Sequence, residues 1–74
     1  MNVEALAPEE LKAIYIRNLQ ELDVLKQKKL QGKGLKEMDV NRYEFLIEEI
    51  LLPIEAHFIK LGENEFLELH SFAA

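Results

Sequence analysis

The chain has 74 residues, a formal net charge of −5, a hydrophobic content of 49% and no cysteine. A chain of this length forms one domain at most, and it buries so small a core that such proteins usually need disulfides, a metal or a second subunit. The lack of cysteine excludes disulfides and thiolate metal sites, and the hydrophobic content is too high for a disordered chain. Good helix packing or oligomerisation remains as the source of stability.

The sequence carries no recognisable targeting or membrane segment. Its N-terminus lacks the basic start and apolar core of a signal peptide. The longest strongly apolar run covers residues 50–52 and continues past Pro53 with Ile54, whereas a membrane span needs roughly 20 residues. We therefore expect a cytoplasmic protein that has no membrane partner.

Residues 8–31 are predicted to form a first helix. Pro8 suits the first helical position, the lysines of the last turn suit the negative end of the dipole, and Gly32 favours a left-handed cap. Asn18 lies within the apolar series and is either a buried residue that fixes register or a residue at a wet margin, which we favour. The predicted apolar face contains Leu11, Ile14, Tyr15, Leu22 and Leu25.

Residues 32–39 are predicted to form a hinge, because two glycines within three residues interrupt the helical pattern. So short a connection makes the flanking helices antiparallel neighbours. The second helix is expected over residues 40–61, with Asn41 and Glu44 as a capping box and Asp39 as a competing, earlier cap. Pro53 lies in its middle, and since the apolar periodicity continues across it, we expect a kink rather than a break.

The second helix is apolar on two sides. One predicted face contains Tyr43, Leu46, Ile47, Ile50, Leu51, Ile54, Phe58 and Leu61. A second stripe, on the opposite side, contains Phe45, Leu52, Ala56 and Ile59. The acidic residues between the two are expected in solvent: Glu44, Glu48 and Glu55. A helix that is apolar on both sides is normally buried on both sides, and the first helix covers only one of them.

The tail, residues 62–74, is expected to contain a short helix from Glu65 to about Phe72, capped by Asn64. The predicted fold is therefore all-α: one domain over residues 1–74, with an antiparallel two-helix hairpin and a short C-terminal helix. Two hairpins are expected to dimerise into a four-helix bundle. The predicted interface residues are Phe45, Leu52, Ala56, Ile59, Phe66 and Phe72. Alternatively, the tail folds back over the second stripe and leaves a monomer.

The residue inventory argues against an enzyme. The chain has no cysteine or threonine, and its single serine is Ser71. Almost no residue could therefore serve as a Ser, Thr or Cys nucleophile supported by a base and an orienting group. Neither His57 nor His70 has a carboxylate three or four residues away, as helical metal sites require. We predict no catalytic residue, no cofactor and no metal site.

Charge is unevenly distributed along the sequence. Residues 26–42, around the hinge, carry a net charge of +4, whereas residues 1–25 carry −3 and residues 43–74 carry −6. The acidic regions oppose nucleic-acid backbones. We expect a non-enzymatic interaction module (an adaptor, co-chaperone or regulator) that binds through an apolar helical surface to a second copy or another protein. The alternative is an acidic inhibitor that occupies a basic nucleic-acid-binding surface of another protein.

Overall fold

The computed structural model describes residues 2–32 and 36–70, and all the regular structure within these ranges is helical, with no strand. The prediction of an all-α protein is therefore confirmed. The elements in chain order are η1 (Val3–Ala5), α1 (Pro8–Leu30), α2 (Glu37–Phe45), η2 (Leu46–Leu51), α3 (Leu52–Leu61) and α4 (Asn64–His70). No helix in the described ranges has both the length and the apolar character needed to cross a membrane.

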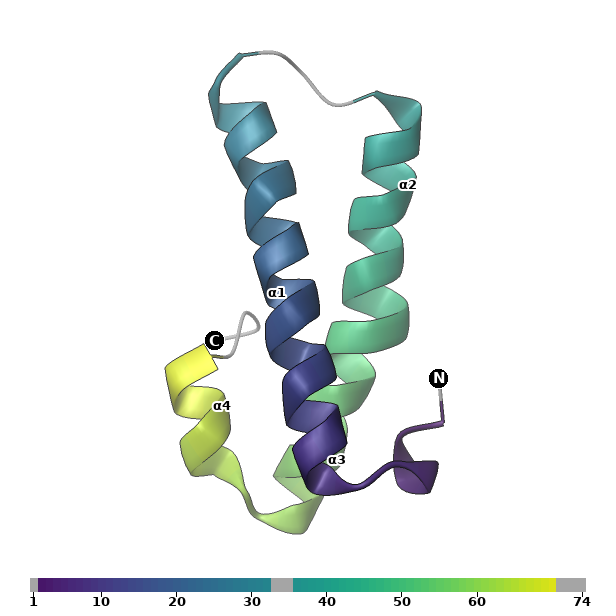
Figure 1. The fold of residues 1–74 in the computed structure, drawn as a ribbon, viewed down its shortest axis with the longest axis vertical. Coiled ribbons are helices and arrows are strands. Elements are labelled where there is room, and N and C mark those ends of the chain that lie inside the picture. Colours follow the sequence, from purple (N-terminus) through teal and green to yellow (C-terminus); the bar gives the residue numbers. More distant parts are fainter. Residues whose placement is uncertain (1, 33–35, 71–74) are drawn as a thin grey trace.

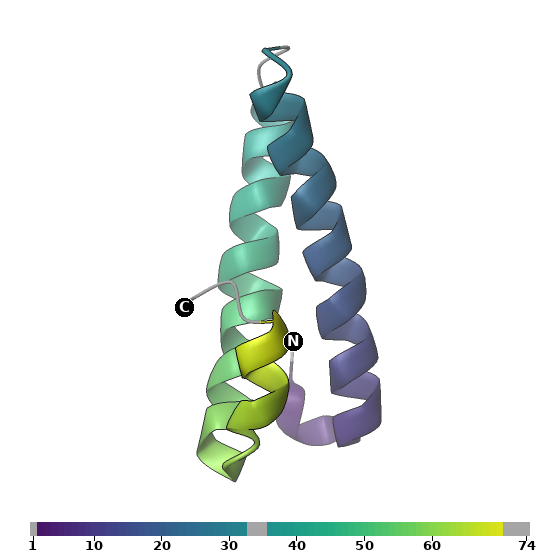
Figure 2. The ribbon, with the colours of Figure 1, turned by 90° about the vertical axis from the view of Figure 1, so that its left-hand side faces the viewer.

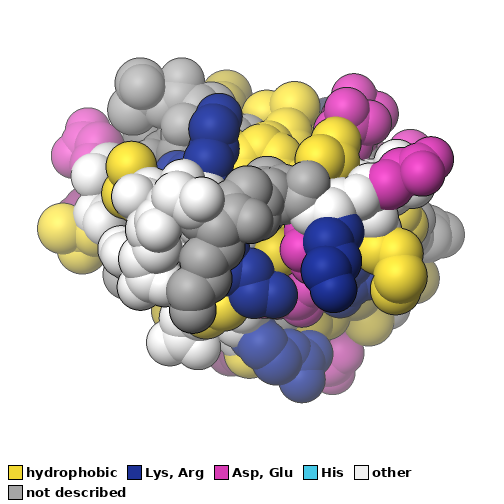
Figure 3. All heavy atoms as spheres, turned by 90° about the horizontal axis from the view of Figure 1, so that it is seen from above, with side chains coloured by type: hydrophobic (Ala, Val, Ile, Leu, Met, Phe, Trp, Pro, Cys, Tyr) yellow, Lys and Arg dark blue, Asp and Glu magenta, His cyan; other side chains and the backbone are white. Residues whose placement is uncertain are grey.

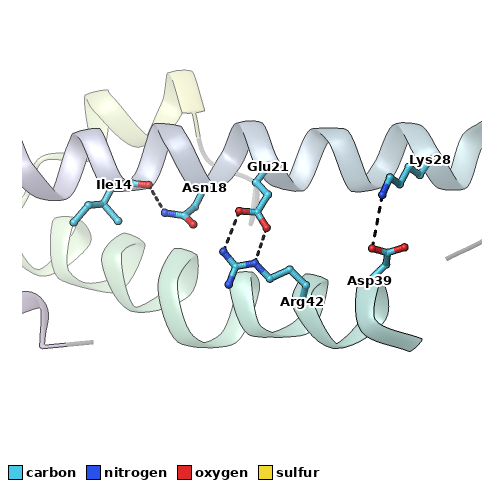
Figure 4. A network of polar contacts seen from close by, with 6 residues as sticks. All are labelled: Ile14, Asn18, Glu21, Lys28, Asp39 and Arg42. Carbon is cyan, nitrogen blue, oxygen red and sulfur yellow. Dashed lines mark hydrogen bonds and ion pairs between the residues drawn. The ribbon is translucent and has the colours of Figure 1, made fainter. Parts of the chain in front are cut away.

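Helix α1 ends one residue before the expected position, with Gln31 as its C-cap and Gly32 in the left-handed region at φ 73°. Asn18, on its buried face, is only 8% exposed, so the expected wet margin is wrong. Its Nδ2 atom donates a hydrogen bond to the Ile14 carbonyl at 2.7 Å, one turn earlier in the same helix (Figure 4). This local bond satisfies the amide donor where water is excluded.

Helix α2 begins at Glu37, three residues before the predicted start, and six residues separate it from α1 in place of the eight predicted for the hinge. The N-cap is Lys36, so neither of the two predicted caps holds that position, and Asp39 is instead the third residue of the helix. The Lys36 N–H donates a hydrogen bond to Asp39 Oδ2 at 3.4 Å, and Glu37 and Asp39 both lie in the first turn, where acidic side chains suit the helix dipole. The predicted capping residue Asn41 instead lies inside the helix.

Helix α1 lies beside α2, η2 and α3 and runs in the opposite direction (Figures 1 and 2). Side-chain contacts follow in antiparallel order from the hinge to the far end. They join Lys28 to Asp39, Glu21 to Arg42, and Tyr15 to Glu55. The buried side chains of both helical stretches meet along this line and form the core, with Leu11, Tyr15, Leu22, Leu46, Leu51, Ile54 and Phe58 at 0–1% exposure.

The helix continues through Pro53 because the turn before it, η2, is a π-helix. The Leu52 N–H donates to the Ile47 carbonyl, five residues back, instead of the Glu48 carbonyl, four residues back. Pro53 has no N–H to offer the Glu49 carbonyl. Glu48 and Glu49, whose carbonyls lose these α-helical donors, are both exposed residues. The turn therefore accommodates proline without ending the helix.

The π turn changes which residues of α3 face α1. A turn closed five residues back holds one extra residue, which rotates everything after it by about 100° relative to an uninterrupted α-helix. Glu55 is consequently buried at 3% exposure, where it accepts a hydrogen bond of 2.9 Å from the Tyr15 hydroxyl. Leu61 lies seven residues after the buried Ile54, on the same side of α3, but it is the last residue of the helix and is 51% exposed. The predictions of a solvated Glu55 and a core Leu61 are therefore wrong.

Two terminal segments cover the core at the end opposite the hinge. Helix α4 packs Phe66 against Tyr15 and Phe58, with ring centroids 5.7 and 5.5 Å apart, and buries Leu67 to 6% exposure. In Figure 1, η1 lies on the other side of α1 from α4, and Val3 and Leu6 pack against the core there. The tail thus folds onto this chain's own core. The rest of the tail, including Phe72, lies outside the described residues.

The π turn can be tested by removing its extra residue. Deletion of Glu49, combined with Pro53→Ala to allow α-helical bonds, should convert η2 into an α turn and leave the core face unchanged. We expect a cooperative thermal unfolding transition by far-ultraviolet circular dichroism. The control is deletion of Ala56 in the same Pro53→Ala background, which rotates Phe58 out of the core and should abolish that transition. If both deletion variants fail to fold, the extra residue of η2 does not set which residues of α3 face the core in the way described.

The Tyr15–Glu55 contact should matter for stability. Tyr15→Phe removes the hydroxyl donor from a buried carboxylate and should lower the free energy of unfolding by about 1.5–3 kcal/mol. Adding Glu55→Leu removes the carboxylate as well and should recover much of that loss, since no buried carboxylate then lacks the tyrosine hydroxyl. Urea denaturation of both variants measures these differences. A double variant that is less stable than Tyr15→Phe alone would contradict the expectation.

Candidate protein interface

The predicted interface residues on the second helical stretch are exposed. Phe45 is 46%, Leu52 41% and Ile59 60% exposed, and Ala56 is also exposed. Single exposed apolar residues are normal on a protein surface, and only a contiguous patch indicates a contact. Their alignment therefore decides whether they form a site.

The π turn separates Phe45 from the other three residues. Phe45 and Leu52 are seven residues apart, which in an uninterrupted α-helix leaves them within about 20° of each other. The extra residue of η2 increases this separation to about 120°. The Phe45 ring instead lies 5.4 Å from the guanidinium carbon of Arg42, which binds Glu21 of α1 on that side. The predicted stripe is therefore not continuous.

A different set of residues lines up along the helix. When the extra residue of the π turn is taken into account, four apolar residues fall within about 40° of one another around the helix axis. They are Val40, Ile47, Leu52 and Ile59. Val40 is 40% exposed, and Ile47 is partly buried against the core. We call Val40, Ile47, Leu52, Ala56 and Ile59 the revised stripe. A constant 100° per residue does not place Val40 and Ile47 in line with Leu52 and Ile59. Pro53 is the only feature of the sequence that could have indicated the change of helical phase.

A groove lies at the hinge end, between the last turns of α1 and the start of α2. It is lined by Leu25, Lys26, Lys29, Leu30, Val40, Tyr43 and Glu44. Leu25 is buried, whereas Leu30 is 78% exposed. Seen along the long axis from this end, Lys and Arg side chains lie beside exposed hydrophobic surface (Figure 3). The groove thus combines an apolar lining with positive charge.

Two ion pairs link the helices on the side away from this groove. Arg42 Nε and Nη2 donate to the two carboxylate oxygens of Glu21 at 2.6 and 3.0 Å, and Lys28 Nζ lies 3.8 Å from Asp39 Oδ1 (Figure 4). The hydrogen bonds from Arg42 lower the pKa of the Glu21 carboxyl and raise the pKa of Arg42. Both pairs are solvent-exposed and add little stability. Each of the four charged side chains nevertheless already has a partner of opposite charge.

The groove lysines have no such partners. Among the described residues, neither Lys26 nor Lys29 forms an ion pair. Lys26 is two residues before Lys28 and so points about 200° away from it around α1. Among the described residues that line the groove, Glu44 is the one acidic residue. The groove therefore presents two cations that are open to an external acidic group.

Phe66 lies apart from the other predicted interface residues. It is partly buried between Tyr15 and Phe58, and the Lys12 ammonium lies 5.3 Å from its ring centroid. Its side chain therefore serves the packing of α4 on this chain's own core. Because α4 leaves Leu52 and Ile59 exposed, the expected alternative of a tail that covers the second stripe is not what the described part of the tail does.

The described residues contain no group of three or more His, Asp or Glu side chains placed to hold a metal ion. His57 is partly buried, with its ring edge-on to Phe58 at 6.2 Å. Tyr15 and Glu55 are 0% and 3% exposed, respectively. Comparisons of the chain with protein-family models, curated proteins and solved structures gave no match. A functional proposal therefore rests on the exposed surfaces.

Phe66 and Phe45 should respond differently to truncation. Phe66→Ala removes a ring that contacts Tyr15 and Phe58 and should destabilise the fold, by less than the roughly 3–5 kcal/mol of a fully buried phenylalanine. Phe45→Ala is the matched control, because that ring is half exposed and lies outside the core, and it should cost under about 1 kcal/mol. Urea denaturation measures both. Equal losses would mean that α4 does not hold Phe66 against the core.

Proposed function

We propose that this chain is a small non-enzymatic protein–protein interaction module, an adaptor, co-chaperone or regulator, that acts in the cytoplasm through an apolar helical surface. The observation that carries the proposal is the alignment of exposed apolar residues in the revised stripe, above all Leu52 at 41% and Ile59 at 60% exposure. Burying one such side chain is worth roughly 1.5–3 kcal/mol. Several of them together approach the whole stability of a small domain.

The proposed occupant of this surface is a second copy of the chain. Helix α1 with α2–α3 constitutes a two-helix hairpin that has one internal seam, and two-fold pairing of hairpins produces a four-helix bundle with a second seam. The revised stripe supports this arrangement because it runs along the second helical stretch beside the internal seam. Such pairing covers Leu52, Ala56 and Ile59, and it leaves Phe45 at the side.

The acidic-inhibitor alternative has less support from the surface. A mimic of nucleic acid needs negative charge, and residues 43–74 supply it with a net charge of −6. A nucleic-acid mimic needs neither an exposed apolar stripe nor a basic groove. Ionic strength separates the two functions, because a charge mimic loses affinity steeply as salt rises, whereas apolar helix docking does not. The same acidic charge argues against a nucleic-acid partner.

The dimer should dissociate when charge is placed on the revised stripe. Sedimentation equilibrium of the native chain should give about twice the chain mass of 8.6 kDa. Leu52→Glu should shift the mass toward that of one chain, because two-fold pairing would bury two carboxylates in an apolar contact. Circular dichroism should show that the variant remains helical.

Two matched controls locate the interface. Val24, on α1, is 58% exposed and points away from the groove, so Val24→Glu changes the same chemistry elsewhere and should leave the mass at twice the chain weight. Phe45→Glu should also leave it unchanged if the π turn removes Phe45 from the stripe. A native chain that sediments as a monomer, or a Leu52→Glu variant that remains dimeric, would overturn the proposal.

A further inference from the structure

Helix α4 and the basic groove lie on the same face of α1, at opposite ends. The Lys12 ammonium contacts α4 through the Phe66 ring at 5.3 Å, and it lies 3.6 Å from Glu63 just before that helix, whereas Lys26 lines the groove. These two lysines are fourteen residues apart in an unbroken α-helix, which places them within about 40° of each other and about 21 Å apart along the axis. Leu19 lies midway between them on the same side.

The revised stripe belongs to this face as well. Its first residue, Val40, lines the groove, and the stripe continues through Ile47 and Leu52 toward Ile59 near the far end. Leu19 and Ile47 are both partly buried and pack against the core from this side. The face thus has an apolar centre, a groove at the hinge end and a helix at the other end. We call it the pairing face.

The two ends of the pairing face are complementary in charge. The groove offers Lys26 and Lys29, which form no ion pair among the described residues. Helix α4 carries Glu65 and Glu68, both exposed, together with Leu69 at 78% exposure. The wider segments follow the same division, with +4 on residues 26–42 and −6 on residues 43–74. Figures 1 and 2 show α4 standing out from α1 at the end opposite the hinge.

We infer that two copies pair antiparallel through this face, so that α4 of each copy lies against the basic groove of the other. The inference rests on the proposed homodimer and specifies its orientation. A two-fold axis perpendicular to the helices and near Leu19 and Ile47 brings the projecting acidic helix of one copy to the groove of its partner. It also brings Leu69 to the exposed Leu30 of the groove. Parallel pairing would place the basic ends together, and like charges across an interface are costly.

A charge exchange tests the contact between α4 and the groove. Lys26→Glu with Lys29→Glu should weaken self-association about tenfold or more at low salt, and so should Glu65→Lys with Glu68→Lys, because each places like charges together. The chain that carries all four substitutions should recover most of the affinity, since every contact again joins opposite charges. Sedimentation equilibrium measures each dissociation constant, and circular dichroism checks the folding. The inference would be overturned if the double variants self-associate as strongly as the native chain, or if the fourfold variant recovers none of the lost affinity.

Cysteine crosslinking tests the orientation directly, since the native chain has no cysteine. Val40→Cys and Ile59→Cys mark the two ends of the revised stripe. Antiparallel pairing predicts that a short bis-maleimide links residue 40 of one copy to residue 59 of the other in a mixture of the two variants, and links neither variant efficiently by itself. Links between identical residues would overturn the orientation and leave the dimer standing. A native chain that sediments as a monomer would overturn the dimer as well.

Discussion

Pro53 cannot donate a backbone hydrogen bond, and the second helical stretch continues through it by closing the preceding turn five residues back, from Leu52 to Ile47. The extra residue in that turn rotates α3 by about 100° relative to α2. Because of this rotation, Leu46 and Leu51 at the two ends of η2 reach 0% exposure against α1, and so do Ile54 and Phe58 of α3. The packing of the two helices depends on this single change of phase.

The same rotation sets the polar interior and the outer surface together. It turns Glu55 inward to meet the Tyr15 hydroxyl at 2.9 Å, where a misaligned helix would leave a carboxylate without its donor. Compared with a pair of matched apolar groups, a buried polar contact of this kind adds little net stability, but it penalises other alignments of α3 on α1 because they would separate the two partners. On the outside, the rotation aligns Leu52 and Ile59 with Val40 and Ile47 and moves Phe45 away. The core register and the exposed apolar line are therefore two results of one backbone feature.

Local signals in the sequence predicted much of the helical framework, because caps and stops depend on neighbouring residues alone. Pro8 begins α1, and Gly32 and Gly62 follow helix ends in the left-handed conformation. Exposure of Leu52, Ala56 and Ile59 could be anticipated because all three follow the π turn and keep their spacing. Phe45 does not join them, because the constant 100° per residue of an α-helix does not hold across η2, which lies between Phe45 and Leu52.

The remaining differences arise from contacts that periodicity does not describe. Asn18 is buried because its amide bonds to a backbone carbonyl of its own helix, and α2 starts early because Asp39 accepts from the Lys36 N–H. Phe66 packs on Tyr15 and Phe58 from a helix of seven residues, Asn64–His70, which is too short to display a clear apolar face. Each of these placements depends on one specific partner and not on a repeated pattern.

The shape of the pairing face bears on why assembly would stop at two chains. The molecule is elongated, with extents of 39 × 23 × 16 Å, and its charge is divided between its ends. An elongated body with opposite charges at its ends could assemble head to tail into open chains. Here α4 and the groove lie on the same face of the molecule, as the positions of Lys12 and Lys26 on α1 require. The proposed two-fold pair would therefore engage both acidic helices and both grooves at once, and it would leave no unmatched end to recruit a third copy.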